Sequence, residues 1–499
     1  MATPSAESAA NDMAALKLSD PAPDSERSVT ELLQRSQGLM AELEQFKACL
    51  KEKKQDKTVE LRHFSTNLQS EIKSLERLAN SDPENEKVAH TISSSNFPFY
   101  SAVWNTAKGC KGITALRKRF FWCTGQTLLK SKRGDLSTKS NIKSVEVDIV
   151  AGEDLEWVKV NTITSRRMIF DLAKAGWAED DSTDDEDDDI VRLDTEDEPE
   201  GLLKQAKLLV EASKLARTKY RHPSVRLVLP RLTLDCPKQV ANVLKEIRAL
   251  GVTVQISEDI PTSPEISTVL HRMVVDPFEK FSGTLNVDCT MIFSFISDLS
   301  HGRVEPKDWH HRFLIKQMEM ESKDQLLPSI VWPACETRRL VCTREAVVRA
   351  QEIVDTIGTN TEKKRMELLF DSNHESTRDQ LAEEFQKLSE YSIPLEWQLP
   401  ISVVDVDIST IVSGLPLVAN NVSNVLTGVN QSVFLYGWAS GLTTISSNRV
   451  VAKEIEATIE ANRGSVDVQG PEIWLSPMAR SLVGKENSDG EPKTDFCCC

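Results

Sequence analysis

The chain has 499 residues, of which 40% are apolar and 27% are charged, and its formal net charge is −16. This length predicts two to four domains with ordinary hydrophobic cores. The net negative charge argues against a protein that coats nucleic acid through charge alone. No run approaches the roughly 18 apolar residues of a membrane span, and the N-terminus lacks the basic and apolar regions of a secretory leader. We therefore expect an intracellular protein, cytoplasmic or nuclear, with no membrane partner.

The ten cysteines are scattered along the chain, and none of them forms a Cys-x-x-Cys pair. This spacing argues against a zinc ribbon or a dithiol redox motif, and it favours reduced thiols. Three of the cysteines form the C-terminal sequence Cys497-Cys498-Cys499, but the fourth position from the end is Phe496, so the pattern does not match a prenylation box.

The N-terminal part of the chain divides into two segments. Residues 1–27 are rich in Ala, Ser, Pro and Asp and are predicted to be disordered. Residues 28–80 hold two amphipathic stretches separated by a charged break, which predicts a helical hairpin or short coiled coil. Its apolar stripe either packs onto the same chain or forms a docking surface for another protein, including a second copy.

A basic run with interleaved aromatic residues follows. Between residues 108 and 143 there are ten Lys or Arg residues and one acid, Asp135. Cations that screen phosphates and rings that stack on bases are what a single strand of RNA needs. The candidate nucleic-acid-binding residues are Lys108, Lys111, Arg117, Lys118, Arg119, Phe121, Trp122, Lys130, Lys132 and Arg133. The alternative is that the aromatic side chains belong to a core and the cations cover a solvated face.

Residues 90–260 are predicted to form an α/β domain. The stretch 144–160 alternates apolar and polar residues around a Gly-containing turn, which indicates a β-hairpin. Residues 178–200 contain fourteen acids and one Arg, so like-charge repulsion predicts a disordered acidic insertion. After it, a strand at 224–232 and a helix followed by a strand at 237–257 predict parallel pairing through a right-handed crossover.

Residues 270–487 are predicted to form a second domain, and residues 488–499 a disordered tail. A strand at 285–287 runs into a helix, and further helices are expected at 343–357, 362–370 and 376–391. Short apolar runs at 432–436, 443–447 and 472–476 indicate strands. The order of these elements predicts a three-layer α/β/α domain with a parallel sheet.

Asp288 interrupts the apolar stretch LNVDCTMIFSFISDLSHG, residues 285–302. In an open parallel sheet, ligands lie beyond the carboxyl ends of the strands, and Asp288 comes where such a strand ends. This placement is typical of PIN-like nuclease domains, in which several strand-end carboxylates hold Mg²⁺ or Mn²⁺ and the bound water attacks a phosphodiester. The alternative is a helix N-cap, since a carboxylate before a helix satisfies free N–H groups and the helix dipole.

Seven stretches of this chain resemble, in their order and spacing, a eukaryotic family that carries the domain of unknown function 1308, which is regarded as PIN-like. The resemblance runs over about 90 to 486, on the stretches 93–104, 145–160, 222–229, 245–254, 285–302, 353–358 and 479–486. The family implies an N-terminal α/β domain followed by the PIN-like domain. It implies no proven activity.

The resemblance suggests catalytic positions residue by residue. Asp288 matches the first PIN carboxylate, Glu345 lies near the helical glutamate, and Asp355 in IVDTIG matches a family position. The family then expects a Gly-Thr-Gly-Asp strand end, where this chain has Leu435-Tyr436-Gly437-Trp438. Trp438 thus stands where a carboxylate is expected. Asp405 and Asp407 are the candidates that could complete a metal site with Asp288 if their strand is adjacent.

Three functions follow as hypotheses. The first is a nucleic-acid-binding or adaptor protein with a degenerate PIN-like domain. The second is a metal-dependent ribonuclease that uses Mg²⁺ or Mn²⁺ at Asp288, Glu345 and Asp405 or Asp407. The third is a protein–protein scaffold that docks partners through residues 28–80 and binds no nucleic acid. The sequence leaves open whether the chain is an enzyme.

Overall fold

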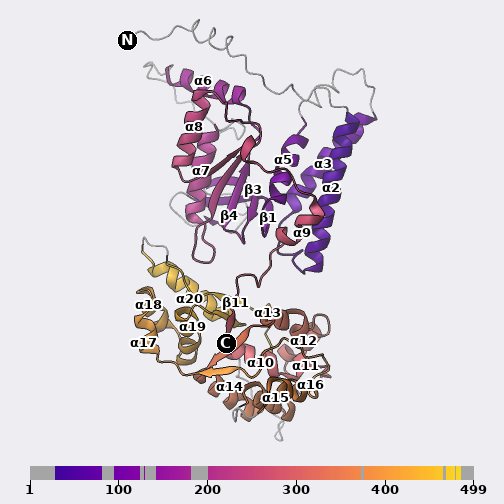
Figure 1. Ribbon diagram of the computed structural model, residues 1–499, viewed down its shortest axis with the longest axis vertical. Coiled ribbons are helices and arrows are strands. Elements are labelled where there is room, and N and C mark those ends of the chain that lie inside the picture. Colours follow the sequence, from indigo (N-terminus) through magenta and orange to yellow (C-terminus); the bar gives the residue numbers. More distant parts are fainter. Residues whose placement is uncertain are drawn as a thin grey trace. The chain divides into compact units, whose positions relative to one another are not determined.

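The computed structural model describes residues 29–80, 95–123, 128–129, 142–180, 201–371, 376–464, 468–477 and 479–484. The chain forms two compact units, Met1–Asp276 and Pro277–Cys499, and each is described by itself (Figure 1). Among the described helices, none is long and apolar enough to cross a membrane. The predicted disordered ends, 1–27 and 488–499, and nearly all of the acidic insertion 178–200 lie outside the described residues.

Six strands in the described part of unit 1 form one mixed sheet, in the order β2-β1-β3-β4-β5-β6. Their bounds are Ala115–Cys123 (β1), Leu128–Leu129 (β2), Ile142–Ala151 (β3), Glu156–Val160 (β4), Ser224–Leu229 (β5) and Thr253–Ile256 (β6). Strands β1 to β4 pair antiparallel, whereas β4, β5 and β6 are parallel. The predicted hairpin is β3–β4, and the predicted parallel crossover joins β5 to β6 through α8 (Lys238–Ala249).

Helices cover both faces of this sheet. One face carries α2 (Val29–Glu52), α3 (Arg62–Ala79), α5 (Phe97–Lys108) and α9 (Ile266–Met273), and the other carries α7 (Leu202–Leu215) and α8, with α6 (Ser165–Asp180) packed against α8 (Figure 1). Neighbouring strand residues alternate between the two cores: Ile149 and Val158 face the first, and Val150 and Trp157 face the second. This period of two is the alternation that the sequence showed.

The hairpin of α2 and α3 packs its apolar stripe onto unit 1 itself. Phe46 of α2 and Phe64 of α3 contact Trp104 of α5, with ring centroids 6.1 and 6.3 Å apart, and all three side chains are almost fully buried. Trp104 also donates its indole N–H to Glu42 over 2.6 Å. The apolar face of residues 29–80 is therefore occupied within the chain, as the first of the two interpretations expects.

Unit 2 is a three-layer α/β/α domain around a parallel sheet, as predicted. Its described strands follow the order β11-β10-β7-β8-β9. Their bounds are Thr284–Val287 (β7), Arg339–Thr343 (β8), Ser402–Val404 (β9), Thr443–Ser446 (β10) and Ile473–Leu475 (β11). Every described pair in this sheet is parallel, so the carboxyl ends of β7, β8, β9, β10 and β11 meet at one edge.

The helices of unit 2 connect these strands. Those between β7 and β9 are α10 (Cys289–Ile296), α11 (Asp298–His301), α12 (Arg312–Glu321), a π-helical turn (Leu327–Val331), α13 (Trp332–Cys335), α14 (Arg344–Ile357), α15 (Asn360–Phe370) and α16 (Arg378–Gln386). The later ones are α17 (Ile408–Ser413), α18 (Val418–Val425), α19 (Gly428–Ala439) and α20 (Arg449–Asn462). The helices expected at 343–357, 362–370 and 376–391 are α14, α15 and α16.

One strand prediction in unit 2 is wrong. Residues 432–436 lie in the middle of α19 and not in a strand, whereas 443–447 and 472–476 contain β10 and β11 as predicted. Val433, Phe434 and Leu435 are all buried, so α19 is apolar around most of its circumference. A short apolar run of this kind reads the same in a buried helix as in a buried strand, so its pattern cannot separate the two.

Candidate functional site

Asp288 lies at the carboxyl edge of the unit 2 sheet, between the end of β7 and the start of α10. Its side chain is 1% exposed. The carboxylate accepts hydrogen bonds from the hydroxyls of Thr290 and Ser446, each over 2.6 Å. Burial raises the pKa of Asp288 above its usual range, although both hydroxyl donors favour the ionised form. Asp288 occupies the N-cap position of α10 but makes no capping hydrogen bond of full geometry; the N–H groups of Cys289 and Thr290 nevertheless favour its ionised form, as the two hydroxyls do.

The two strands beside β7 end in hydroxyl side chains. Ser446, the last residue of β10, bonds Asp288 and also accepts the N–H of Asn448. Thr343, the last residue of β8, shares a 3.0 Å hydrogen bond with Ser432 of α19. Thr343 and Ser446 are fully buried. Asp288 is therefore part of a closed, hydrogen-bonded cluster that joins β7 to β10.

The other candidate carboxylates on this edge have surroundings of their own. Glu345 lies exposed in the first turn of α14. Asp405 follows β9 and forms an ion pair with Arg344, and this pair lowers the pKa of Asp405. Asp407 caps α17 by accepting from Ser409 and Thr410. Since β9 is two strands from β7, about 10 Å separates their ends, which is too far for carboxylates that share one ion.

Asp355 lies at the other end of α14 from Glu345. Ten residues of helix separate the two, which corresponds to about 15 Å at 1.5 Å per residue. Asp355 is exposed and accepts a hydrogen bond from Gln351 of the same helix. Among the described residues, no group of three or more His, Cys, Asp or Glu side chains is placed so that it could hold a metal ion. The structure thus separates Asp355, Asp405 and Asp407 from Asp288.

Trp438 is not at a strand end, so its predicted placement is wrong. It lies in the last turn of α19 and donates its indole N–H to the carbonyl of Gln469 over 3.1 Å. Of the two strands beside β7, β10 ends at Ser446, and the sequence Ser446-Ser447-Asn448 contains no acid.

Gly437 has a packing role that explains the glycine in the same motif. A Cβ atom at this position would lie 2.1 Å from the Thr444 hydroxyl and 2.9 Å from the Asn286 amide nitrogen. Asn286 donates to Thr444 over 3.0 Å and to the carbonyl of Val433 over 2.8 Å, and both polar side chains are fully buried. Only glycine lets α19 approach β7 and β10 this closely.

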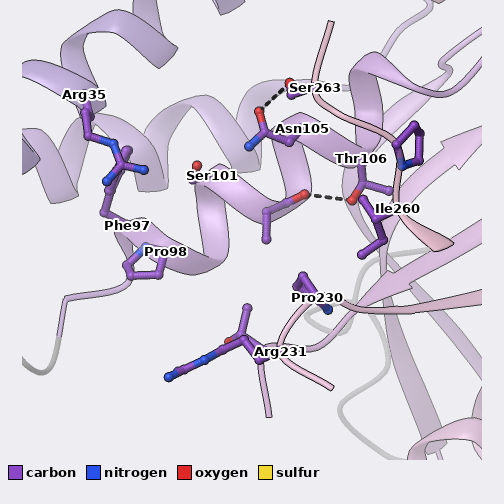
Figure 2. A pocket seen from close by; sticks show the side chains of 13 residues that line it. Arg35, Phe97, Pro98, Ser101, Asn105, Thr106, Pro230, Arg231, Ile260 and Ser263 are labelled. Carbon is purple, nitrogen blue, oxygen red and sulfur yellow. Dashed lines mark hydrogen bonds between the residues drawn. The ribbon is translucent and has the colours of Figure 1, made fainter. Parts of the chain in front are cut away.

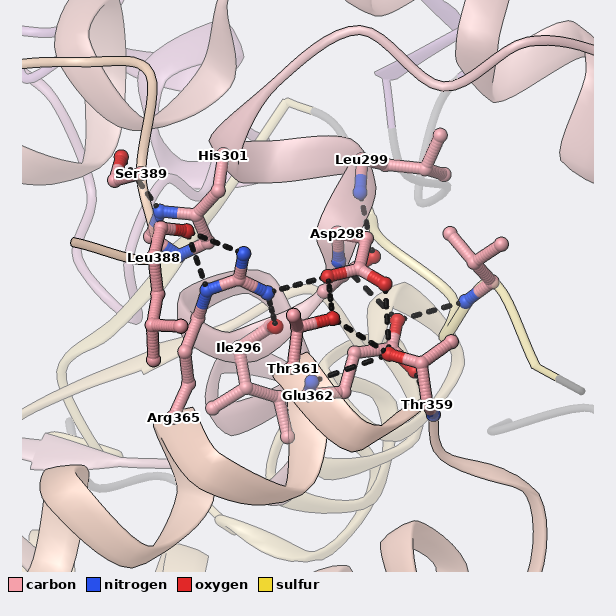
Figure 3. A network of polar contacts seen from close by, with 12 residues as sticks. Ile296, Asp298, Leu299, His301, Thr359, Thr361, Glu362, Arg365, Leu388 and Ser389 are labelled. Carbon is pink, nitrogen blue, oxygen red and sulfur yellow. Dashed lines mark hydrogen bonds and ion pairs between the residues drawn. The ribbon is translucent and has the colours of Figure 1, made fainter.

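A larger buried polar network lies where α10, α11 and α15 meet (Figure 3). Asp298 accepts hydrogen bonds from Thr359 (2.7 Å), Thr361 (2.6 Å) and Arg365 (2.7 Å). Arg365, which is 4% exposed, also donates to the carbonyls of Ile296 and Leu388. Burial opposes ionisation of Asp298, but its three donors outweigh that effect and lower its pKa.

Two further ionisable groups complete this network. Glu362 is fully buried and accepts the N–H groups of Thr359, Asp298 and Val483; burial nevertheless raises its pKa. His301, 2% exposed, must donate its Nε2–H to the Phe295 carbonyl (2.6 Å), because a carbonyl only accepts. Burial, with the positive charge of Arg365 nearby, lowers the pKa of His301 to about 3, so the ring is neutral.

The network also holds residues 479–484 against the domain. Ser481 donates its N–H to Gln317 (2.9 Å) and its carbonyl accepts from Ser297 (2.7 Å). The adjacent Arg480 forms a buried ion pair with Glu321. The end of the stretch 285–302, the stretch 353–358 and residues 479–484, all of which carried the family resemblance, therefore meet or border here. The sequence analysis does not single out Arg365 and Glu362, because both look like ordinary charged residues of a helix. The feature that could have revealed them as buried is a charged pair three residues apart on the apolar face of α15.

The predicted nucleic-acid residues in unit 1 lie mainly in ion pairs and in the core. Lys108 is buried against Glu42 (3.0 Å), and Arg117 pairs with Glu146 (2.6 Å). Trp122 is fully buried and bonds Glu211. The remaining described members are Lys111, which is exposed, Lys118, which lies over the Phe120 ring, Arg119, which is 3.6 Å from Glu146, and the half-buried Phe121. Lys130, Lys132 and Arg133 lie outside the described residues.

Comparison with known proteins gives one match. Residues 285–393 match the family model described as protein of unknown function, DUF1308. No curated protein and no solved structure matches the chain. The matched residues include Asp288, Asp298, Glu362 and Arg365, but not Asp405 or Ser446. The stretch from β7 to the residues after α16 is thus the domain of unknown function 1308 that the sequence motifs indicated.

Proposed function

We propose that this protein is an adaptor that binds a partner through a degenerate PIN-like domain and does not cleave nucleic acid. Metal-dependent phosphodiester cleavage needs several carboxylates around one or two divalent ions. The observation that carries the proposal is the surroundings of Asp288. Its carboxylate is buried between the hydroxyls of Thr290 and Ser446, and the neighbouring strands β8 and β10 end in Thr343 and Ser446.

The charge at this edge supports the same conclusion. Asp405, the acid that would extend the site beyond β8, is paired with Arg344. Bringing Asp405 to Asp288 would require breaking that pair and crossing the end of β8. Asp288 and Asp405 lie about two strands apart, and a guanidinium is bound to Asp405. This arrangement lacks the concentrated negative charge that Mg²⁺ or Mn²⁺ requires.

We place the adaptor inside the cell. As its partner we favour another protein over single-stranded RNA. Of the described cations in the basic run, Lys108, Arg117 and Lys143 are paired with acids of this chain and would have to exchange those partners for phosphates. In unit 2, Leu417 and Val450 expose 87% and 65% of their area, beside and on the packed helices α18 and α20. Exposed apolar side chains of this kind favour contact with another protein.

The test is an assay with the full-length chain and a fluorescent single-stranded RNA in the presence of Mg²⁺ or Mn²⁺. We expect no cleavage by the wild type. The variants are Asp288→Asn and, as a control for an exposed acid in the same unit, Asp379→Asn. Cleavage by the wild type and by Asp379→Asn that is lost in Asp288→Asn would refute the proposal and establish the alternative, a metal-dependent ribonuclease.

The choice of partner is tested by fluorescence anisotropy with the same RNA at low ionic strength. Binding through phosphates weakens steeply as salt is raised. We expect no saturable binding, since Lys108, Arg117 and Lys143 of the basic run are paired with acids of this chain. Salt-sensitive binding without cleavage, weakened by Arg119→Gln, would instead identify the nucleic-acid-binding form of the adaptor and would reject the protein-partner form.

A further inference from the structure

Unit 1 contains a cavity that none of the functions above uses. It has a volume of about 330 Å³, at the small end of the usual range for ligand pockets and equal to roughly ten water molecules at about 30 Å³ each. Its walls come from Thr162 after β4, Pro230 and Arg231 after β5, and the segment from Ile260 to Ser263 after β6. The cavity therefore lies beyond the carboxyl ends of the three parallel strands, where open α/β sheets bind ligands.

The charge in the cavity is positive. The side chains that line it include Arg35 and Arg231 and no Asp or Glu. Arg231 is exposed, and among the described residues its guanidinium makes no hydrogen bond or ion pair. Arg35 of α2 lies over the Phe97 ring, 5.5 Å from its centroid, which orients the guanidinium without neutralising it. Glu31, one turn earlier on α2, does not line the cavity.

Figure 2 shows Arg35 and Arg231 on opposite sides of the first turn of α5, with Pro98 between them. This is the positive end of the α5 dipole, and it adds to the field of the two guanidinium groups. The acids nearest in sequence to the β6 wall are already engaged, because Glu258 accepts the N–H of Leu234 and Asp259 accepts the N–H of Ile256.

The cavity is also rigid and has an apolar floor. Pro98, Pro230 and Pro261 fix the backbone of three of its walls. Asn105 and Ser263 are joined by a 2.9 Å hydrogen bond across the rim, which is visible in Figure 2. Apolar surface from the prolines and Ile260 alternates with hydroxyls. A preformed apolar floor with a few converging polar groups is what a small-molecule site requires.

We propose that this cavity binds a compact molecule that carries one phosphate monoester on an apolar body. Two guanidinium groups from separate elements match the double negative charge of a phosphate monoester, which accepts hydrogen bonds on three oxygens. The hydroxyls of Ser101 and Thr162 line the same cavity and supply further donors. The apolar floor accommodates the body of the ligand. This site is independent of the adaptor role proposed for unit 2.

The experiment is isothermal titration of the full-length chain with phenyl phosphate as the probe. We expect weak, saturable binding, and at least tenfold weaker binding of inorganic phosphate, which lacks the apolar body, and of phenol, which lacks the charge. Arg231→Gln should reduce the affinity for phenyl phosphate about tenfold, or about 1.4 kcal/mol, and Arg35→Gln with Arg231→Gln should abolish binding. Arg248→Gln is the matched control, an exposed arginine on α8 outside the cavity.

Each substituted side chain is exposed, so a thermal melt should show that the variants fold like the wild type. The proposal is overturned if phenyl phosphate does not bind at millimolar concentration, or if Arg231→Gln and Arg35→Gln bind it as well as Arg248→Gln does. Equal binding of benzoate would refute the phosphate assignment, since a carboxylate carries only half the charge.

Discussion

Arg365 is the group whose removal should destabilise unit 2 most clearly. It is 4% exposed and connects three elements: the carbonyl of Ile296 at the end of α10, the carboxylate of Asp298 in α11 and the carbonyl of Leu388 after α16. The informative change is Arg365→Met, because methionine keeps most of the length and apolar contact of the side chain. The variant therefore removes the charge and the donors but leaves only a small void.

The magnitude follows from the groups that lose their donor. The buried carbonyl of Ile296 and the half-buried carbonyl of Leu388 each lose a hydrogen bond, at about 1–3 kcal/mol. Asp298 loses its cation but keeps the hydroxyls of Thr359 and Thr361, so its contribution lies at the lower end of that range. The sum is about 4 kcal/mol, within the 3–5 kcal/mol typical of a broken buried ion pair. Asp298→Asn should cost about half as much, since an amide oxygen still accepts from Arg365.

The assay is hydrogen exchange of the full-length chain, read by mass spectrometry on peptides from α10 and α15. A loss of about 4 kcal/mol accelerates exchange through unfolding about a thousandfold. Peptides from β4 and β5 in unit 1 should not change. Arg349→Met is the matched control, an exposed arginine on α14 paired with Glu352 at the surface, and should shift exchange by less than about 0.5 kcal/mol. An effect of Arg365→Met no larger than that of the control would refute the reasoning.

Three further predictions concern stability, and urea unfolding measures each. Gly437→Ala should lower the free energy of unfolding by about 3 kcal/mol, because the added Cβ displaces Thr444 and Asn286. Gly428→Ala, in the open first turn of α19, should be neutral. Equal effects of the two substitutions would contradict the close approach of α19 to the sheet. Burial lowers the pKa of His301 from 6.5 to about 3. The neutral ring therefore contributes about 5 kcal/mol of stability above pH 6.5, and this stability is lost as pH falls through 3. His301→Gln should remove that acid dependence. Burial raises the pKa of Asp288, so the stability that its protonated form contributes is present below about pH 4 and is lost as pH rises through the folded pKa. Over that window the free energy of unfolding of Asp288→Asn should rise relative to that of the wild type. A difference that stays constant with pH would count against a buried carboxylate.

Much of the fold could be predicted from the chain alone, because the strands and helices concerned carry a clear period. The alternation in 144–160 gives the β3–β4 hairpin, and the stripe of Leu39, Leu43, Phe46 and Leu50 gives α2. The failure at 432–436 has a physical cause. Helix α19 is buried on nearly all sides, so its sequence has no polar face that would reveal a period of 3.6 residues.

The candidate site was less predictable, because it depends on which strand ends are neighbours. Asp288 was placed correctly at the end of a strand, since that follows from local pattern. Its relation to Asp405, two strands away, and to Ser446, on the adjacent strand, is set by the strand order β11-β10-β7-β8-β9. Strand order arises from long-range packing and leaves no local mark, so the sequence could not show that β10, which ends at Ser446, lies beside β7 or that Trp438 lies in a helix.

The positions of the resemblance motifs bear on what this domain retains. The stretch 285–302 contains both Asp288 at the end of β7 and Asp298 in the buried network. The stretch 353–358 and residues 479–484 border that same network, where Glu362 and Arg365 bond backbone groups of Asp298, Ile296 and Val483. A half-satisfied buried network is more destabilising than none, so these residues depend on one another for folding. These buried residues are therefore accounted for by the stability of the domain, and a fold does not by itself imply a reaction.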